Sequence, residues 1–205
     1  MKIICVGRNY AEHIAELKNE KPAEPVLFIK PDSAILPNKN PLYLPPIANE
    51  FHYEVELIVK INKLGKFIEP GFAHRYYDEI GLGIDITARD LQNQLKAKGL
   101  PWEKAKAFHN SAVVSPVFLP KSRFENINRI SFGLKKNGNW VQKGNTAEML
   151  WKIDALIAYI STYFMLKKGD LIFTGTPAGV GKMEINDEFT GFIENTEMFR
   201  VKVKG

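Results

Sequence analysis

The chain has 205 residues, of which 45% are hydrophobic and 25% are charged, and its net charge is +5. This is the composition of an ordinary globular protein with enough chain for a sizeable core. The basic residues are scattered and form no run with interleaved aromatics, so nucleic-acid binding is not expected. No stretch reaches the ~20 apolar residues of a membrane span or forms a signal peptide, so we expect a cytoplasmic protein without a membrane partner. The single cysteine, Cys5, excludes an internal disulfide.

The first half of the chain predicts short buried strands separated by helices and turns. β-Branched and apolar residues gather in the four strands expected at 2–6, 26–30, 51–61 and 80–86. Helical patterns are expected at 11–17, with Asn9 as N-cap, at 72–77, and at 87–98, where Gly99 and Pro101 follow. Polar composition with two prolines predicts a loop at 18–25, and the prolines and asparagines of residues 31–50 predict short extended pieces and turns.

The second half predicts a hairpin, one long helix and further strands. Residues 130–135 and 140–142 pair across a turn at 136–139, and apolar residues at helical spacing predict a helix over 146–164. Strands are expected at 116–120, 170–174, 188–190 and 198–203. The glycine-rich segment 175–181 lacks both the P-loop ending and the dinucleotide-binding pattern. We therefore expect a tight turn there whose backbone amides and threonine hydroxyls hold a carboxylate.

Two carboxylates on the strand expected at 51–61 indicate a charged site. Glu54 and Glu56 are same-face neighbours, about 6.5–7 Å apart on a strand, and burial without a positive partner would be costly. A solvated strand face is the alternative. Asp85 ends the next apolar strand, as a site residue or as the N-cap of the following helix. The three carboxylates form an all-oxygen set, which suits Mg²⁺, Mn²⁺ or Ca²⁺ and disfavours zinc.

A histidine and a lysine are further candidates for chemistry. His13 and Glu16 are three residues apart and share a face of the first helix, so they can act as a base and its orienting carboxylate. An ordinary charged helix surface gives the same spacing. Lys106 is either a buried cation or a solvated lysine.

Taken in chain order, these segments resemble the fumarylacetoacetate hydrolase family, and most closely its short, single-domain acylpyruvate hydrolase branch. The matching segments are Gly7-Arg8-Asn9-Tyr10-Ala11-x-His13, Pro25-x-x-Phe28-x-Lys30-Pro31, Glu54-x-Glu56-Leu57, Asp85-x-Thr87-Ala88-Arg89-Asp90-x-Gln92, Gly99-Leu100-Pro101-Trp102-x-x-x-Lys106 and Gly169-Asp170-x-Ile172-x-Thr174-Gly175-Thr176-Pro177-x-Gly179-Val180-Gly181. The resemblance implies an α+β fold of mixed, barrel-like β-roll sheets with flanking helices. It also implies one catalytic domain over residues 1–205 that forms a homodimer.

The resemblance implies roles for individual residues as well. The implied metal ligands for Mg²⁺ or Mn²⁺, with Ca²⁺ able to occupy the site, are Glu54, Glu56 and Asp85. The implied catalytic groups are His13 and Glu16, as a water-activating pair on a lid helix, and the active-site cation Lys106. The implied substrate contacts are Arg8, Lys30, Arg89, Gln92 and Thr176. His109 departs from the family pattern after Lys106 and can alter the choice of substrate.

The reaction expected from this resemblance is metal-dependent hydrolysis of a C–C bond in a 3-acylpyruvate-like diketo acid, which releases pyruvate and a carboxylic acid. The small anionic keto acid would chelate the metal, His13 would activate water, and Lys106 would stabilise the oxyanion. The same enolate chemistry supports two alternatives. One is oxaloacetate decarboxylation, and the other is isomerisation or tautomerisation of unsaturated keto diacids of the 2-hydroxyhepta-2,4-diene-1,7-dioate type. A non-catalytic binding relative is a third, but it would need no base.

Overall fold

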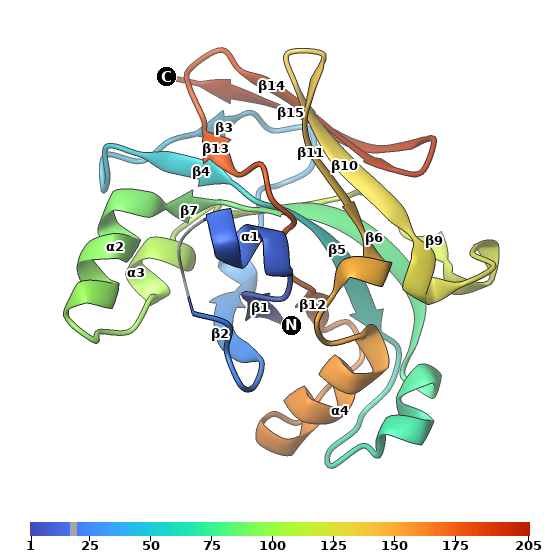
Figure 1. Ribbon diagram of the computed structural model, residues 1–205. Coiled ribbons are helices and arrows are strands. Elements are labelled where there is room, and N and C mark those ends of the chain that lie inside the picture. The colour runs from blue at the N-terminus through green and yellow to red at the C-terminus, as the bar shows by residue number, and fades with distance from the viewer. Residues whose placement is uncertain (17–19) are drawn as a thin grey trace.

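The computed structural model describes residues 1–16 and 20–205, which form an α+β fold with a curled, half-barrel sheet and few helices (Figure 1). This confirms the expected fold class. The helices are α1 (Ala11–Glu16), α2 (Arg89–Ala97), α3 (Glu103–Lys106) and α4 (Ile153–Tyr163), with 3₁₀ turns at Asp32–Ala34, Pro70–Arg75, Lys121–Arg123, Ile127–Arg129 and Thr146–Glu148. The strands are β1 (Lys2–Gly7), β2 (Val26–Pro31), β3 (Leu42–Tyr43), β4 (Phe51–Tyr53), β5 (Val55–Ile61), β6 (Tyr77–Asp85), β7 (Thr87–Ala88), β8 (Ala112–Val114), β9 (Leu119–Pro120), β10 (Ser131–Lys136), β11 (Asn139–Asn145), β12 (Leu171–Phe173), β13 (Gly181–Lys182), β14 (Glu188–Ile193) and β15 (Thr196–Lys204).

The largest sheet has the strand order β2-β1-β12-β5-β6-β8, with β9 also paired to β6. A second sheet runs β11-β10-β14-β15-β3, and a small third sheet runs β13-β4-β7. Helices α2 and α3 lie side by side at one flank, and α4 lies at another (Figure 1). Because β5 and β6 are antiparallel, the start of β5 lies beside the end of β6. This pairing brings Glu56, near the start of β5, and Glu54, just before it, close to Asp85 at the end of β6.

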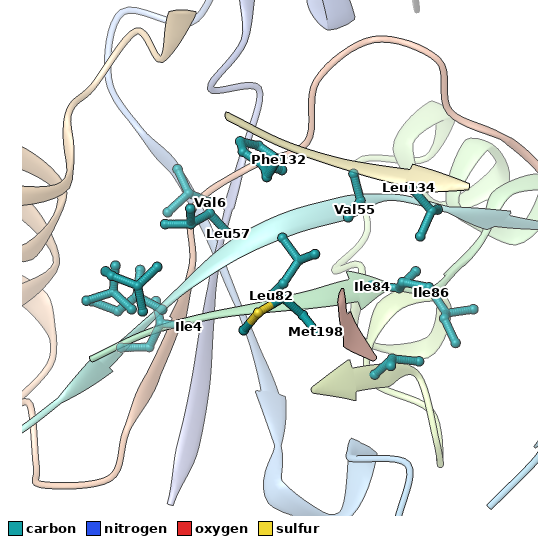
Figure 2. Packing of buried hydrophobic residues seen from close by; sticks show 14 of the residues in the cluster. Ile4, Val6, Val55, Leu57, Leu82, Ile84, Ile86, Phe132, Leu134 and Met198 are labelled. Atoms are coloured by element: carbon teal, nitrogen blue, oxygen red, sulfur yellow. The ribbon is translucent and has the colours of Figure 1, made fainter. Parts of the chain in front are cut away.

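Strand β5 is buried on both faces, and its side chains alternate as the sequence predicts. Val55, Leu57 and Val59 join the larger apolar cluster, whereas Ile58 joins a smaller one with Ile3 and Cys5. Figure 2 shows Val55 and Leu57 among apolar side chains from the neighbouring strands β6 and β10. The alternation fixes which side chains of β5 face away from the larger cluster.

The strand expected at 51–61 is divided at Glu54, and the helix expected at 87–98 begins later than predicted. Both differences have one cause. Strand β4 leaves the large sheet and pairs with β7, so residues 87–88 are used in a sheet and the helix starts at Arg89. Asp85 does not cap this helix, whose N-cap position is Ala88 without a side-chain hydrogen bond. The alternative of Asp85 as an N-cap is therefore wrong.

The helix expected at 146–164 is also shorter, because the chain is held extended before Ile153. Asn9 Oδ1 accepts the N–H of Trp151 at 2.8 Å, and its Nδ2 donates to the carbonyl of Trp151 at 3.1 Å. The Asn9 side chain is thus bound to a distant segment, and the prediction that it caps the first helix is wrong. The region expected as a helix at 72–77 is a 3₁₀ turn.

Other local predictions are confirmed. Strands β10 and β11 form the expected hairpin, and Asn137 and Gly138 have φ values of 52° and 83°, as a tight two-residue turn requires.

Leu17 of the first predicted helix, and Lys18 and Asn19 of the loop after it, lie outside the described residues. Within residues 1–16 and 20–205, every helix is too short or too polar to cross a bilayer.

The close approach of β6 to its neighbours at Gly83 gives a test of the packing. A Cβ added at Gly83 would lie 2.3 Å from the carbonyl oxygen of Val113 and 2.7 Å from Ile58 Cδ1. We expect Gly83→Ala to lower the free energy of unfolding by about 1–3 kcal/mol in urea titrations. The exposed Gly71 has no heavy atom within 4 Å of such a Cβ, so Gly71→Ala should lose no stability. Equal stability of the two variants would contradict this packing.

Candidate active site

Three carboxylates meet where β5 begins and β6 ends. Glu54, Glu56 and Asp85 are all buried, and each offers an oxygen within 4.8 Å of the oxygens of the other two. The backbone fixes their approach, because the N–H of Asp85 donates to the carbonyl of Glu54 at 2.8 Å. The alternative of a solvated strand face is therefore wrong. We call these three residues the acidic triad.

Glu54 is compensated by two cations. Its Oε2 lies 2.7 Å from Lys106 Nζ, and its Oε1 accepts a hydrogen bond from Arg89 Nη2. Burial alone would raise the pKa of Glu54, but Lys106 and then Arg89 outweigh burial and hold that pKa well below its usual range. Glu54 is thus ionised at neutral pH.

Glu56 has a different environment. Its Oε2 accepts the N–H of Gly175 at 2.7 Å, and no ion pair of Glu56 occurs within residues 1–16 and 20–205. Burial, followed by the charges of Asp85 and Glu54, raises the pKa of Glu56 well above its ordinary value. A cation shared by the acidic triad would remove this repulsion, and oxygen donors are the ligands that Mg²⁺ and Mn²⁺ prefer. The residues therefore fit a divalent metal site.

Lys106 is a buried cation, and the alternative of a solvated lysine is wrong. Its Nζ lies 2.7 Å from Asp85 Oδ2 as well as from Glu54, and it donates to Thr87 Oγ1 at 2.6 Å. The ammonium also lies 5.1 Å from the centre of the Phe28 ring. Helix α3 thus places one positive charge between two members of the acidic triad.

Lys30 lies behind Asp85 and does not line the cavity described below. It is fully buried, with Nζ in an ion pair 2.8 Å from Asp85 Oδ1 that lacks hydrogen-bond geometry. The same ammonium donates to the carbonyl and the hydroxyl of Ser111 at 3.0 and 3.1 Å, and to the carbonyl of Lys106. A contact between Lys30 and substrate stays a prediction, and the geometry favours a role in holding Asp85.

Helix α1 brings His13 to the same region. His13 Nδ1 lies 3.3 Å from Glu16 Oε2, and His13 is buried whereas Glu16 is partly exposed. Burial lowers the pKa of His13, although the nearby charges of Glu54 and Glu16 act in the opposite direction. The imidazole is therefore neutral at pH 7. With Nδ1 facing Glu16, Nε2 is the nitrogen that carries the free lone pair.

The glycine-rich loop between β12 and β13 holds two of these carboxylates by its backbone. The N–H of Gly175 donates to Glu56, and the N–H of Gly179 lies 3.1 and 3.2 Å from the two oxygens of Glu16. Both glycines have left-handed φ values, 102° and 95°. The prediction is confirmed for the backbone amides, with side chains of the chain itself as the ligands. The Thr174 hydroxyl instead donates to the carbonyl of Leu57 at 2.9 Å, and a carboxylate contact of the Thr176 hydroxyl stays a prediction.

One cavity brings most of the predicted site residues together. It is bounded by the acidic triad, by His13 and Lys106, and by four of the five predicted substrate contacts, namely Arg8, Arg89, Gln92 and Thr176. Arg89 Nη1 donates to Gln92 Oε1 at 2.6 Å, so these two are already oriented by each other. His109 is exposed and does not line this cavity, so nothing in its position supports a role in substrate choice.

The cavity also has walls that the sequence did not indicate as a site. Phe28 and Trp102 supply aromatic surface, with ring centres 6.0 Å apart. Lys96 lines the cavity from α2. A signal for Lys96 was present in the sequence, because residues 89, 92 and 96 share one face of a helix.

Comparisons with known proteins identify similar chains. A family model described as "Fumarylacetoacetate (FAA) hydrolase C-terminal" matches residues 2–205. The mitochondrial oxaloacetate tautomerase of Mus musculus is 43% identical over 202 residues, which cover 98% of this chain and 91% of that protein. The mitochondrial oxaloacetate decarboxylase of Dictyostelium discoideum is 41% identical over 184 residues, which cover 89% of this chain and 84% of that protein. A crystal structure of fumarylpyruvate hydrolase from Pseudomonas aeruginosa, in complex with Mn²⁺ and pyruvate, matches with a TM-score of 0.93 at 34% identity, covering 100% of this chain and 89% of that one.

The environment of Glu56 predicts how the protein responds to metal. Glu56→Gln keeps an acceptor for the Gly175 N–H but removes one of three crowded charges. We expect Mg²⁺ or Mn²⁺ to raise the melting temperature of the wild type. At a metal concentration of 100 times Kd, the free energy of unfolding should rise by about 2.7 kcal/mol. The variant should lose this response. Glu79→Gln, at the exposed partner of Lys60, should keep it. A full metal response in Glu56→Gln would contradict the assignment.

The buried Lys30 predicts a large effect on stability. Lys30→Met leaves the Asp85 carboxylate without that ion pair and leaves the Ser111 carbonyl without that donor. We expect a loss of about 3–5 kcal/mol in the free energy of unfolding, measured by urea titration. Lys60→Met breaks an exposed ion pair of similar length and should cost about 1 kcal/mol or less. A similar cost for both variants would show that the contacts of Lys30 are weak.

Proposed function

The chain belongs to the fumarylacetoacetate hydrolase family, and we propose from this premise that it is a metal-dependent tautomerase of oxaloacetate, moving a proton between C3 and the oxygen on C2. The observation that carries the proposal is a buried His13, paired with Glu16, in one cavity with the acidic triad and Lys106. The identity to the mouse oxaloacetate tautomerase supports the choice of substrate. Tautomerisation thereby takes precedence over the acylpyruvate hydrolysis expected first from the sequence.

The metal would be held by Glu54, Glu56 and Asp85. Mg²⁺ or Mn²⁺ bound there would act as a Lewis acid that polarises the C2 carbonyl and makes the C3 hydrogens more acidic. Mn²⁺ and pyruvate in the similar fumarylpyruvate hydrolase support both this metal class and a small 2-keto acid as the ligand. The choice between Mg²⁺ and Mn²⁺ belongs to the proposal.

His13 serves as the base. Its Nε2 takes a proton from C3 of the keto form, and the electron pair of the broken C–H bond forms the C2–C3 double bond. Glu16 accepts a hydrogen bond from Nδ1 and stabilises the positive charge that develops on the ring. The imidazolium then gives its proton to the oxygen on C2, which completes the enol and restores the base.

The remaining groups position and stabilise. Lys106, fixed between Glu54 and Asp85, places positive charge beside the oxygen that becomes negative. Phe28 and Trp102 form apolar walls of the cavity, and apolar surroundings strengthen electrostatic interactions. Arg8, Arg89, Gln92 and Thr176 line the same cavity and can contact the anionic substrate.

His13 also separates this reaction from decarboxylation. Loss of CO₂ from oxaloacetate needs an electron sink at C2 and then a proton at C3 of the enolate, but no base. The His13–Glu16 pair anchored to Gly179 therefore suits tautomerisation better, because that reaction needs a base at C3. Hydrolysis of an acylpyruvate is the second candidate, because the same pair could activate water and because a fumarylpyruvate hydrolase is structurally similar. A panel of oxaloacetate and acylpyruvates, scored for loss of enol, release of CO₂ and release of pyruvate, separates the three reactions.

Substitution of His13 tests the proposal. With Mg²⁺ present, the wild type should speed the conversion of enol to keto oxaloacetate, followed by ultraviolet absorbance against a protein-free blank. We expect His13→Ala to lower kcat about 10²–10⁴-fold, because the base is lost. His109→Ala makes the same change at an exposed histidine outside the cavity and should leave kcat unchanged. A wild type without tautomerase activity, or a fully active His13→Ala, would refute the proposal.

A further inference from the structure

The charges that line the cavity do not cancel. Three carboxylates, those of the acidic triad, face four cationic side chains, those of Arg8, Arg89, Lys96 and Lys106. A fifth cation, Lys30, lies behind Asp85. A divalent ion on the acidic triad would add two further positive charges. Such a cavity favours a substrate with two negative charges over one with a single charge.

The four cations have different surroundings. Lys106 and Arg89 are directed at the acidic triad, since both bind Glu54 and Lys106 also binds Asp85. Lys96 lies on the same face of α2 as Arg89 and Gln92, one helical turn beyond Gln92. Helical side chains lean toward the N-terminus of their helix, so the Lys96 stem is directed back toward Gln92 and the cavity.

Arg8 lines the same cavity as Lys96. Burial first, and the charge of Arg8 second, lower the pKa of Lys96, and the effect of Arg8 exceeds those of Arg89 and Lys106. Arg8 has a φ of 60°, a left-handed conformation that is unfavourable for a residue with a side chain. Strained backbone of this kind is concentrated at functional sites. Arg8 and Lys96 thus both belong to the lining of this cavity.

We propose that Lys96 determines specificity for dicarboxylates by binding the substrate carboxylate that is remote from the 2-keto acid group. The inference rests on the proposed function, in which oxaloacetate is the substrate, and it adds the residue that distinguishes this diacid from pyruvate. Arg8 lines the same cavity. A diacid offers Lys96 a second carboxylate to bind, whereas a mono acid offers none.

The test compares two ligands, oxaloacetate and pyruvate, on Mg²⁺-loaded protein. Ligand-induced shifts in melting temperature give the Kd of each, and tautomerase kinetics give KM and kcat separately. The wild type should bind oxaloacetate more tightly than pyruvate. Lys96→Gln should weaken oxaloacetate binding about ten- to a hundred-fold, the value of a charge-assisted hydrogen bond, and leave the pyruvate Kd within about two-fold. The loss should be in KM more than in kcat.

Two further variants control this experiment. Lys96→Arg keeps the charge and should restore most of the preference for oxaloacetate. Lys98→Gln removes the same charge from the exposed end of the same helix, outside the cavity, and should change neither Kd. It also controls for the interaction of a lysine with the helix dipole.

The outcomes separate the inference from the proposed function. A preference for oxaloacetate that survives in Lys96→Gln, or that is lost equally in Lys98→Gln, overturns the inference while tautomerase activity stands. Equal weakening of oxaloacetate and pyruvate binding in Lys96→Gln also overturns the inference, because Lys96 would then not bind the second carboxylate. A preference that depends on Lys96 in a protein without tautomerase activity supports the inference and refutes the proposed function.

Discussion

Three carboxylates buried within 4.8 Å of one another repel each other, and the surrounding chain is arranged around that repulsion. Lys106 and Arg89 compensate Glu54, and Lys106 and Lys30 compensate Asp85, whereas Glu56 is bound by the amide of Gly175 and has no cationic partner among the described residues. Because leaving a buried charge without a partner is costly, the uneven compensation at Glu56 indicates a place for a cation. The candidate metal site therefore follows from the energetics of burial as well as from the choice of ligands.

The topology explains how distant segments supply these groups. Antiparallel pairing of β5 and β6 joins Glu54 and Glu56 to Asp85, and the strand pair β4–β7 sets the point at which α2 begins. The loop after β12 connects two parts of the candidate site. Its amides bind Glu56, which belongs to the acidic triad, and Glu16, which is paired with His13. The proposed base and the candidate metal site are in this way both held by one short glycine-rich segment.

Much of this could be predicted from the sequence, because the decisive patterns are local. Alternation in β5 gave the buried strand, Asn137-Gly138 gave the hairpin turn, and the ordered motifs gave the family and the acidic triad. Tertiary contacts decided the rest. Asn9 bonds to Trp151 across the fold, and pairing of residues 87–88 with β4 delays α2; neither can be inferred from local propensity. Lys30 matched a motif, but only the fold shows it behind Asp85. The homodimer, the single domain and the cytoplasmic location stay predictions.

Anomalous diffraction from crystals grown with Mn²⁺ and oxalate, which resembles the enolate of pyruvate, would test the metal-site assignment most directly. We expect one strong anomalous peak, from a Mn²⁺ ion bound by oxygens of Glu54, Glu56 and Asp85 at about 2.0–2.2 Å. Oxalate should complete the coordination, and His13 should face the oxalate. A peak at another set of residues, or no peak within reach of the acidic triad, would contradict the account of why these three carboxylates are buried together.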